Sequence, residues 1–223
     1  MSDTEREVFD YLANAEHIEA AFDLYTIMPR VINGFHQKFW EKLMEEVQRK
    51  LGDRGITGWE ASFSSTDASD CLNDAYFTFQ IAPPQDDKDL RTYCSFFIQQ
   101  AYDPDGRKKH REDSMRHAEL RYGIGIEPGV GEKQQKKLPA EVAKLWQSMK
   151  DWDLYGRERQ LEDGTIAVRR LGYSIRARNE VIRLAQPGDT LEKEIADKLF
   201  ELFEEKRDVV IKCNLALKTW KAS

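Results

Sequence analysis

The chain has 223 residues, of which 40% are hydrophobic, 11% aromatic and 33% charged, and its formal net charge is −6 at pH 7. This apolar and aromatic content is sufficient for a folded interior, which excludes a chain that is disordered throughout. The negative charge argues against a protein that coats nucleic acid over its whole surface.

Targeting and cysteine patterns indicate a cytoplasmic protein. The N-terminus is acidic where a signal peptide would be basic and then apolar, and no apolar run approaches the roughly 18 residues of a membrane span. Cys71, Cys94 and Cys213 lie far apart without a C-x-x-C pair, so we expect reduced cysteines and no zinc site. We therefore predict no membrane association, no metal and no cofactor.

The first 52 residues read as two amphipathic helices. Apolar residues recur three or four positions apart from Val8 to Tyr25 and again from Ile32 to Leu51. Pro29 lies between the two runs and is expected to separate them. Gly52 is suited to the left-handed cap that ends the second helix.

The pattern then changes to a period of two, which predicts strands. Four short runs rich in aromatic and β-branched residues cover 58–63, 76–81, 93–102 and 119–127. Their connections are too short for crossover helices, so consecutive strands are expected to pair antiparallel. A meander is the simplest topology.

The C-terminal part is expected to be mostly helical. A helix follows Pro139 and ends near Asp151, a further strand covers 166–171, and 173–185 leans towards helix. A last helix begins after Asp189 or Thr190, either of which can cap it. Residues 209–217 fit a strand or a continued helix, and we favour the helix because no turn residue precedes them.

Together these elements predict a single α+β domain over residues 1–223. It has two N-terminal helices (1–52), a mainly antiparallel sheet of four or five strands (56–127 with one later strand), and C-terminal helices (139–223) packed on one face.

Four glycines, Gly123, Gly125, Gly129 and Gly131, lie within nine positions. Their spacing matches neither the dinucleotide-binding fingerprint nor the phosphate loop. Gly123 and Gly125 fall on one face of a strand and leave it bare. Such a strip favours close packing of another backbone or helix, and the alternative is a ligand lying on it.

Two basic clusters are candidates for phosphate contact: Lys133, Lys136 and Lys137 in one, and Arg107, Lys108 and Lys109 in the other. The alternative is that these side chains simply solvate loops, because neither cluster is interleaved with aromatic residues as in single-strand binders.

Residues 157–183 contain seven arginines and four acids, whereas 189–208 contain eight acids and four bases. The arginine-rich segment therefore either binds a partner or pairs with the acidic segment. Exposed aromatic residues near the middle helix would complete a partner-binding surface. The candidate partner-binding residues are Arg169, Arg170, Arg176, Arg178, Trp152 and Tyr155.

No catalytic residues are predicted. His110, Glu112, Asp113 and His117 form the only close cluster of histidines and carboxylates, and their spacing fits no H-E-x-x-H helix. Asp86 to Lys88 spell the D-x-K of a nuclease site, but they fall in a predicted loop. Serine nucleophile motifs such as G-x-S-x-G are absent.

Five stretches in chain order carry a family resemblance: FHQKFWEKLMEEVQRKL, YFTFQI, YCSFFIQQAY, RYGIGIE and TLEKEIADKLFELFEEKRDVV. Over roughly residues 30 to 210 they resemble the non-catalytic C-terminal region of bacterial PD-(D/E)XK nuclease-family proteins of the defence and restriction type. The resemblance implies an accessory or recognition module, and it carries no nuclease activity over to this chain.

The preferred function is a non-enzymatic interaction module of a bacterial or phage defence or counter-defence system, binding a protein partner. Two alternatives stay open: a nucleic-acid-binding or nuclease-related accessory protein, and a domain that binds a small ligand in a cleft between the sheet and the last helix. The sequence leaves the oligomeric state undetermined.

Overall fold

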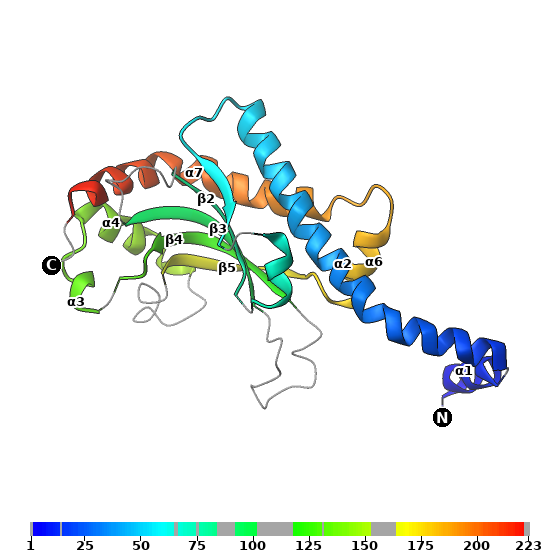
Figure 1. Ribbon diagram of the computed structural model, residues 1–223. Helices are drawn as coiled ribbons and strands as arrows, with labels where there is room; N and C mark the ends of the chain where they lie inside the picture. Colours follow the sequence, from blue (N-terminus) through cyan, green and yellow to red (C-terminus); the bar gives the residue numbers. More distant parts are fainter. Residues whose placement is uncertain are drawn as a thin grey trace.

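The computed structural model of the protein describes residues 2–13, 15–64, 67–74, 76–83, 92–101, 118–130, 132–152 and 164–220. The helices are α1 (Asp3–Leu12), α2 (Ala15–Asp53), α3 (Glu132–Gln135), α4 (Ala140–Ser148), α6 (Arg178–Ala185) and α7 (Leu191–Thr219), with short 3-10 helices η1 (Ala68–Leu72) and η3 (Lys150–Trp152). Figure 1 shows α2 and α7 beside one sheet, and the N-terminal end of α2 reaching away from the body.

The five strands form one antiparallel sheet in chain order, as the short connections predicted. They are β1 (Glu60–Phe63), β2 (Thr78–Ala82), β3 (Tyr93–Ala101), β4 (Glu119–Glu127) and β5 (Thr165–Ser174). The longest ladder joins β3 to β4 from the pair Tyr93 and Glu127 to the pair Ala101 and Glu119. The α+β class and the antiparallel sheet are therefore confirmed.

One face of the sheet carries the hydrophobic core, and the helices pack against that face. On β3 the buried residues Cys94, Phe96 and Ile98 alternate with residues of the opposite face, as strand geometry requires. Helix α7 places Phe203 with its ring centroid 5.0 Å from that of Phe96. Helix α2 adds Trp40, whose ring is fully buried.

The boundary between the first two helices was predicted wrongly. Helix α1 ends at Leu12, and α2 continues without a break through Pro29. A proline inside a helix costs about 3 kcal/mol but need not end it. The apolar pattern continues on both sides of Pro29.

The end of α2 also differs from the prediction. Gly52 lies within the helix, and Gly55 adopts the left-handed conformation with φ of 59°. The backbone turns there because only glycine enters this region without steric cost.

Two ambiguous segments are settled by tertiary packing. Residues 173 and 174 complete β5, and helix begins only at Arg178. Residues 209–217 continue α7, because Val210, Cys213 and Leu217 are buried on the face that meets the sheet while Leu215 is 60% exposed. Helical continuation, the favoured alternative, is confirmed.

A side chain of α7 takes the place of a missing strand partner. The pairing of β2 with β3 ends at Ile81 and Phe96, so the backbone of Cys94 extends beyond it. The buried Asn214 amide oxygen accepts a hydrogen bond from the Cys94 N–H at 2.6 Å, and its nitrogen donates to the Cys94 carbonyl at 3.1 Å. Both backbone groups are thereby satisfied inside the protein.

Candidate protein-interaction surface

Two of the candidate partner-binding residues meet in the fold. The Arg169 guanidinium lies over the Trp152 ring, 4.3 Å from its centroid, and the Tyr122 ring lies 5.4 Å from Trp152. Trp152 and Tyr122 are half-buried, whereas Arg169 is exposed. We call Tyr122, Trp152 and Arg169 the Arg169 cluster.

Three separate elements bring the Arg169 cluster together. Trp152 ends η3, which follows α4, and α4 is anchored by its buried residues Val142 and Leu145. Arg169 stands on the edge strand β5 directly opposite Tyr122 of β4. Opposite residues of an antiparallel pair share a face, so Arg169 and Tyr122 both lie on the helix-covered side.

The electrostatics of the cluster follow from its half-buried position. Burial raises the pKa of the Tyr122 hydroxyl, and the positive charge of Arg169 opposes that rise. The phenol therefore stays neutral and able to donate a hydrogen bond. A cation held over an aromatic face is worth about 0.5–1 kcal/mol at an exposed site.

Arg170 points to the other face of the sheet. It stands opposite Arg121, and its Nε lies 3.1 Å from a carboxylate oxygen of Glu119. Its side chain is 61% exposed. Neighbouring arginines in the sequence thus face opposite sides, because side chains alternate along a strand.

The remaining candidates are distributed differently. Arg178 is exposed at the start of α6. Tyr155 lies outside the described residues, as do Arg157 and Arg159. The partner-binding role of all these residues stays a prediction.

Arg176 is half-buried and binds a side chain of α2. Its guanidinium donates to the Asn33 side-chain oxygen at 2.9 Å. Close by, the fully buried His36 donates through Nε2 to the Gln100 side-chain oxygen at 2.8 Å. The Gln100 amide nitrogen is committed to the carbonyls of Cys71 and Asp74, so Gln100 must accept from His36.

Burial of His36 predicts a loss of stability in mild acid. Desolvation lowers the pKa of His36 from 6.5 to about 4, with a further lowering by Arg176 and an opposing effect of Gln100. Below pH 6.5 the unfolded chain takes up a proton that the folded chain refuses, so the free energy of unfolding falls as the pH decreases. We expect a loss of about 2 kcal/mol between pH 7 and pH 5.

Urea denaturation at several pH values measures this effect. His36→Gln removes the titrating group and should flatten the dependence in this window, whatever its effect on stability at pH 7. The control is His17→Gln, which makes the same substitution at a half-exposed position of α2. An identical pH slope for wild type and His36→Gln would contradict the prediction.

Three acids of the C-terminal segment pair with α2 or with Arg54, the residue that follows it. Lys50 contacts Asp197 at 2.5 Å, Arg54 contacts Glu204, and Lys42 contacts Glu192 at 3.5 Å. From the arginine-rich segment, Arg183 joins these contacts by binding Asp189 at 3.0 Å and Glu194 at 2.8 Å. Arg183 therefore joins the arginine-rich segment to the acidic segment, whereas Arg169, Arg170 and Arg176 have other partners.

The start of α7 explains part of this arrangement. The Asp189 carboxylate accepts a hydrogen bond from the Leu191 N–H at 2.8 Å, whereas the Thr190 side chain makes no capping bond. Asp189 therefore caps the helix, one of the two alternatives that the sequence left open.

The lysine cluster is only partly described. Lys136 and Lys137 form the turn after α3, and the Lys137 carbonyl accepts a hydrogen bond from Trp220 Nε1 at 2.9 Å. Lys133 lies on α3, but its side chain is outside the described part of the structure. Arg107, Lys108 and Lys109 also lie outside the described residues, so the phosphate-contacting edge stays a prediction.

The glycine strip provides close backbone packing, as predicted. A Cβ built on Gly123 would lie 1.9 Å from the carbonyl oxygen of Ala167 in β5. Gly125 lies beside the Phe97 ring and the Gly164 carbonyl, at 3.4 and 3.1 Å from its ideal Cβ. The bare face of β4 therefore lets β5 and Phe97 approach.

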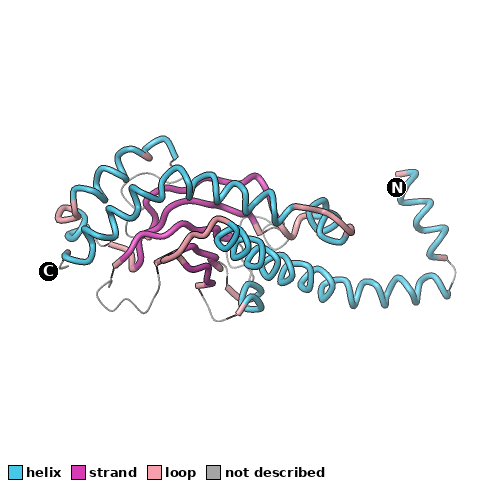
Figure 2. Tube along the Cα trace, turned by 90° about the horizontal axis from the view of Figure 1, so that it is seen from above, coloured by secondary structure: helices cyan, strands magenta, loops and turns pink. Residues whose placement is uncertain are grey.

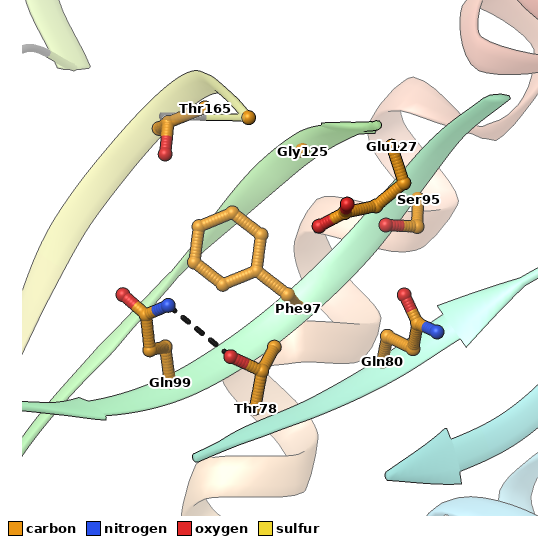
Figure 3. A pocket seen from close by; sticks show the side chains of 9 residues that line it. Thr78, Gln80, Ser95, Phe97, Gln99, Gly125, Glu127 and Thr165 are labelled. Carbon is orange, nitrogen blue, oxygen red and sulfur yellow. Dashed lines mark hydrogen bonds between the residues drawn. The ribbon is translucent and has the colours of Figure 1, made fainter. Parts of the chain in front are cut away.

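A small hollow lies over the same strip, on the sheet face opposite α7 (Figure 3). It has a volume of about 30 Å³, far below the roughly 300–1,000 Å³ of ordinary ligand pockets. Thr78, Gln80, Ser95 and Gln99 line it with polar groups, and the Glu127 carboxylate leans over it. Although Glu127 is exposed overall, partial burial of its carboxylate raises its pKa.

The interface between the sheet and α7, where a ligand cleft was a sequence-based alternative, is filled by aromatic rings. Trp59 and Phe96 both pack on Phe203, with ring centroids 5.2 and 5.0 Å away. The hollow described above is therefore separate from this interface.

Neither metal-binding nor membrane-spanning elements are found in the described part of the chain. No three His, Cys, Asp or Glu residues there could hold a metal ion together. None of its helices has the length and apolar composition needed to cross a bilayer. His110, Glu112, Asp113 and His117 lie outside the described residues, as do Asp86, Asp87 and Lys88.

Comparison with known proteins adds no relative. No protein-family profile matches the chain, and neither the curated proteins nor the solved structures contain a match.

Sequence reasoning missed several residues that matter here. For Tyr122 the sequence indicates only a place in a strand. Its contact with Trp152 joins two residues 30 positions apart in the chain, which local spacing does not predict. Asn214 gave no signal beyond being a polar residue on an apolar helix face. That exception to the helix pattern was the one sequence feature that could have identified it.

Proposed function

We propose that the protein is a non-enzymatic interaction module and that the Arg169 cluster is the centre of its docking face for a protein partner. The contact between Arg169 and Trp152 carries this proposal. Tryptophan, tyrosine and arginine are the residue types that dominate binding energy at protein interfaces. All three occur in this cluster, on one face and in mutual contact.

The arrangement also lowers the entropic cost of binding. An arginine that is already held over an aromatic ring loses less side-chain freedom when a partner arrives. Its guanidinium edge stays exposed and can bind a carboxylate or a backbone carbonyl. We therefore expect a partner surface with an acidic side chain beside an apolar patch.

The setting in bacterial or phage defence, including counter-defence, is part of the proposal. Its support is the order of sequence stretches that resemble the non-catalytic region of PD-(D/E)XK nuclease-family proteins. The five stretches overlap α2, β2, β3, β4 and α7 of the body. We therefore expect the partner to be a protein of such a system.

Affinity capture with variant proteins tests the docking face. We expect proteins recovered by the wild-type chain to be lost with Arg169→Glu and with Trp152→Ala, because each removes one half of the contact. Arg170→Glu is the matched control, since it makes the same charge change at the next residue on the opposite face. It should retain the captured proteins.

Two results would contradict the assignment. Unchanged recovery with both Arg169→Glu and Trp152→Ala would exclude the cluster as the docking face. Equal loss with Arg170→Glu would show that binding does not distinguish the two faces. Arg176 is unsuitable for this test because its bond to Asn33 helps to hold α2 in place.

A further inference from the structure

An apolar helical arm extends from the body of the protein. It consists of α1 and residues 15–31 of α2, and Figures 1 and 2 show it reaching well beyond the sheet. Ten large apolar side chains of this arm are 41–81% exposed: Val8, Phe9, Tyr11, Ile18, Phe22, Leu24, Tyr25, Ile27, Met28 and Val31. A concentration of this kind marks an interaction surface.

The arm carries the spacing of a helix in a bundle. One apolar seam on α2 alternates intervals of three and four residues, and a second seam does the same about 110° further round the helix. The first seam consists of Ile18, Ala21, Tyr25, Met28 and Ile32, and the second of Ala20, Leu24, Ile27 and Val31. A single neighbouring helix can cover one seam only, so the pattern requires a bundle.

The exposed area is sufficient for a stable dimer. Phe9, Tyr11, Phe22 and Tyr25 are each 63–81% exposed. At about 150–250 Å² per aromatic side chain, these four alone present roughly 400–700 Å². The six aliphatic and methionine side chains add to this, which brings the arm to the roughly 800 Å² per partner of a standard interface.

The distribution of charge on the arm favours a second copy of the chain as the partner that covers its apolar surface. The arm contains seven acids against Arg6 and Arg30, so an anionic lipid surface would repel it. Glu16, Glu19 and Asp23 lie on the side of α2 opposite the first seam. Two arms that meet through this seam therefore keep these carboxylates in water.

We propose that two copies of the chain associate arm to arm, with their α2 helices antiparallel and crossing near Tyr25. In this register Ile18 of each copy packs near Ile32 of the other, and the two Tyr25 side chains meet at the crossing. The α1 helices, with Val8 and Phe9 exposed, then cover the second seams and complete a four-helix bundle. Antiparallel pairing also opposes the two helix dipoles and places the two bodies at opposite ends.

Sedimentation of the 223-residue chain tests the association. We expect a species of twice the 26.0 kDa chain mass. The double variant Ile18→Glu/Tyr25→Glu should raise the dimer dissociation constant by at least about 30-fold, the factor for loss of one hot-spot side chain. Leu215→Glu, at an apolar residue that is 60% exposed on α7, is the control and should remain dimeric.

Disulfide trapping tests the direction. With the two-fold axis near residue 25, Tyr25→Cys should form a cross-linked dimer on oxidation, whereas Ile18→Cys should not. Ile18→Cys mixed with Ile32→Cys should give the mixed dimer. Efficient cross-linking of Ile18→Cys with itself would overturn the antiparallel arrangement.

Two outcomes of the sedimentation experiment would overturn the association itself. One is a wild-type chain that stays monomeric up to about 100 µM, and the other is a dimer that the double variant does not weaken. Wild-type flotation with zwitterionic vesicles, lost in the double variant, would assign the arm to a lipid surface instead. The capture experiment on Arg169 uses a separate surface, so either proposal can fail without the other.

Discussion

Gly123→Ala is expected to lower the free energy of unfolding by about 3 kcal/mol or more. The added methyl group would lie 1.9 Å from the Ala167 carbonyl oxygen and 3.0 Å from the Val168 Cα. Both are backbone atoms of β5, so relief requires separating two paired strands. Overpacking in well-packed regions typically costs 1–3 kcal/mol, and a backbone clash in the middle of a ladder lies at the upper end.

Urea denaturation monitored by tryptophan fluorescence measures this change. Gly52→Ala is the matched control, because its Cβ would meet nothing within 4 Å and its backbone is helical. Alanine is favoured there by about 0.5–1 kcal/mol, so the midpoint should stay or rise. If Gly123→Ala retained wild-type stability, β5 would not cross Gly123 as closely as the structure shows.

Asn214→Leu is expected to cost about 3 kcal/mol, even though leucine suits a buried helix face. The substitution removes both hydrogen bonds to the backbone of Cys94, which is fully buried. Each buried backbone group left without a partner costs about 1–3 kcal/mol. The greater hydrophobicity of leucine offsets only part of this loss.

Asn179→Leu makes the same change at an exposed position of α6 and should alter stability by less than about 0.5 kcal/mol. Amide hydrogen exchange gives a second measurement, because the Cys94 N–H should exchange faster in Asn214→Leu. Equal stability of the two variants would show that Asn214 does not complete the edge of β3.

Local sequence patterns were sufficient to predict the strands and their order, because burial of one strand face and the length of the connections decide these features. The alternation in β3 and β4 predicted both strands within a residue or so of their ends, because one face of each is buried. The short connections between the strands predicted the antiparallel order. Pro29 was misleading, since a single unfavourable residue was weighed above an apolar pattern that continues through it.

The candidate site required information that no local pattern contains. Arg169 and Arg170 are neighbouring residues of the same type, yet Arg169 contacts Trp152 and Arg170 contacts Glu119. The difference depends on the register of β5 against β4 and on the position of η3. Arg176 and Asp197 likewise found their partners on α2, more than a hundred residues away in the chain.

The sequence by itself determined the fold class, the strand order and the helical course of the last segment, because hydrophobic periodicity acts within each element. Only the tertiary structure decided which arginines meet an aromatic ring, which side chain satisfies the edge of β3, and that the N-terminal arm stands free of the core. Those outcomes depend on contacts between distant elements, whose geometry is set by packing rather than by local spacing.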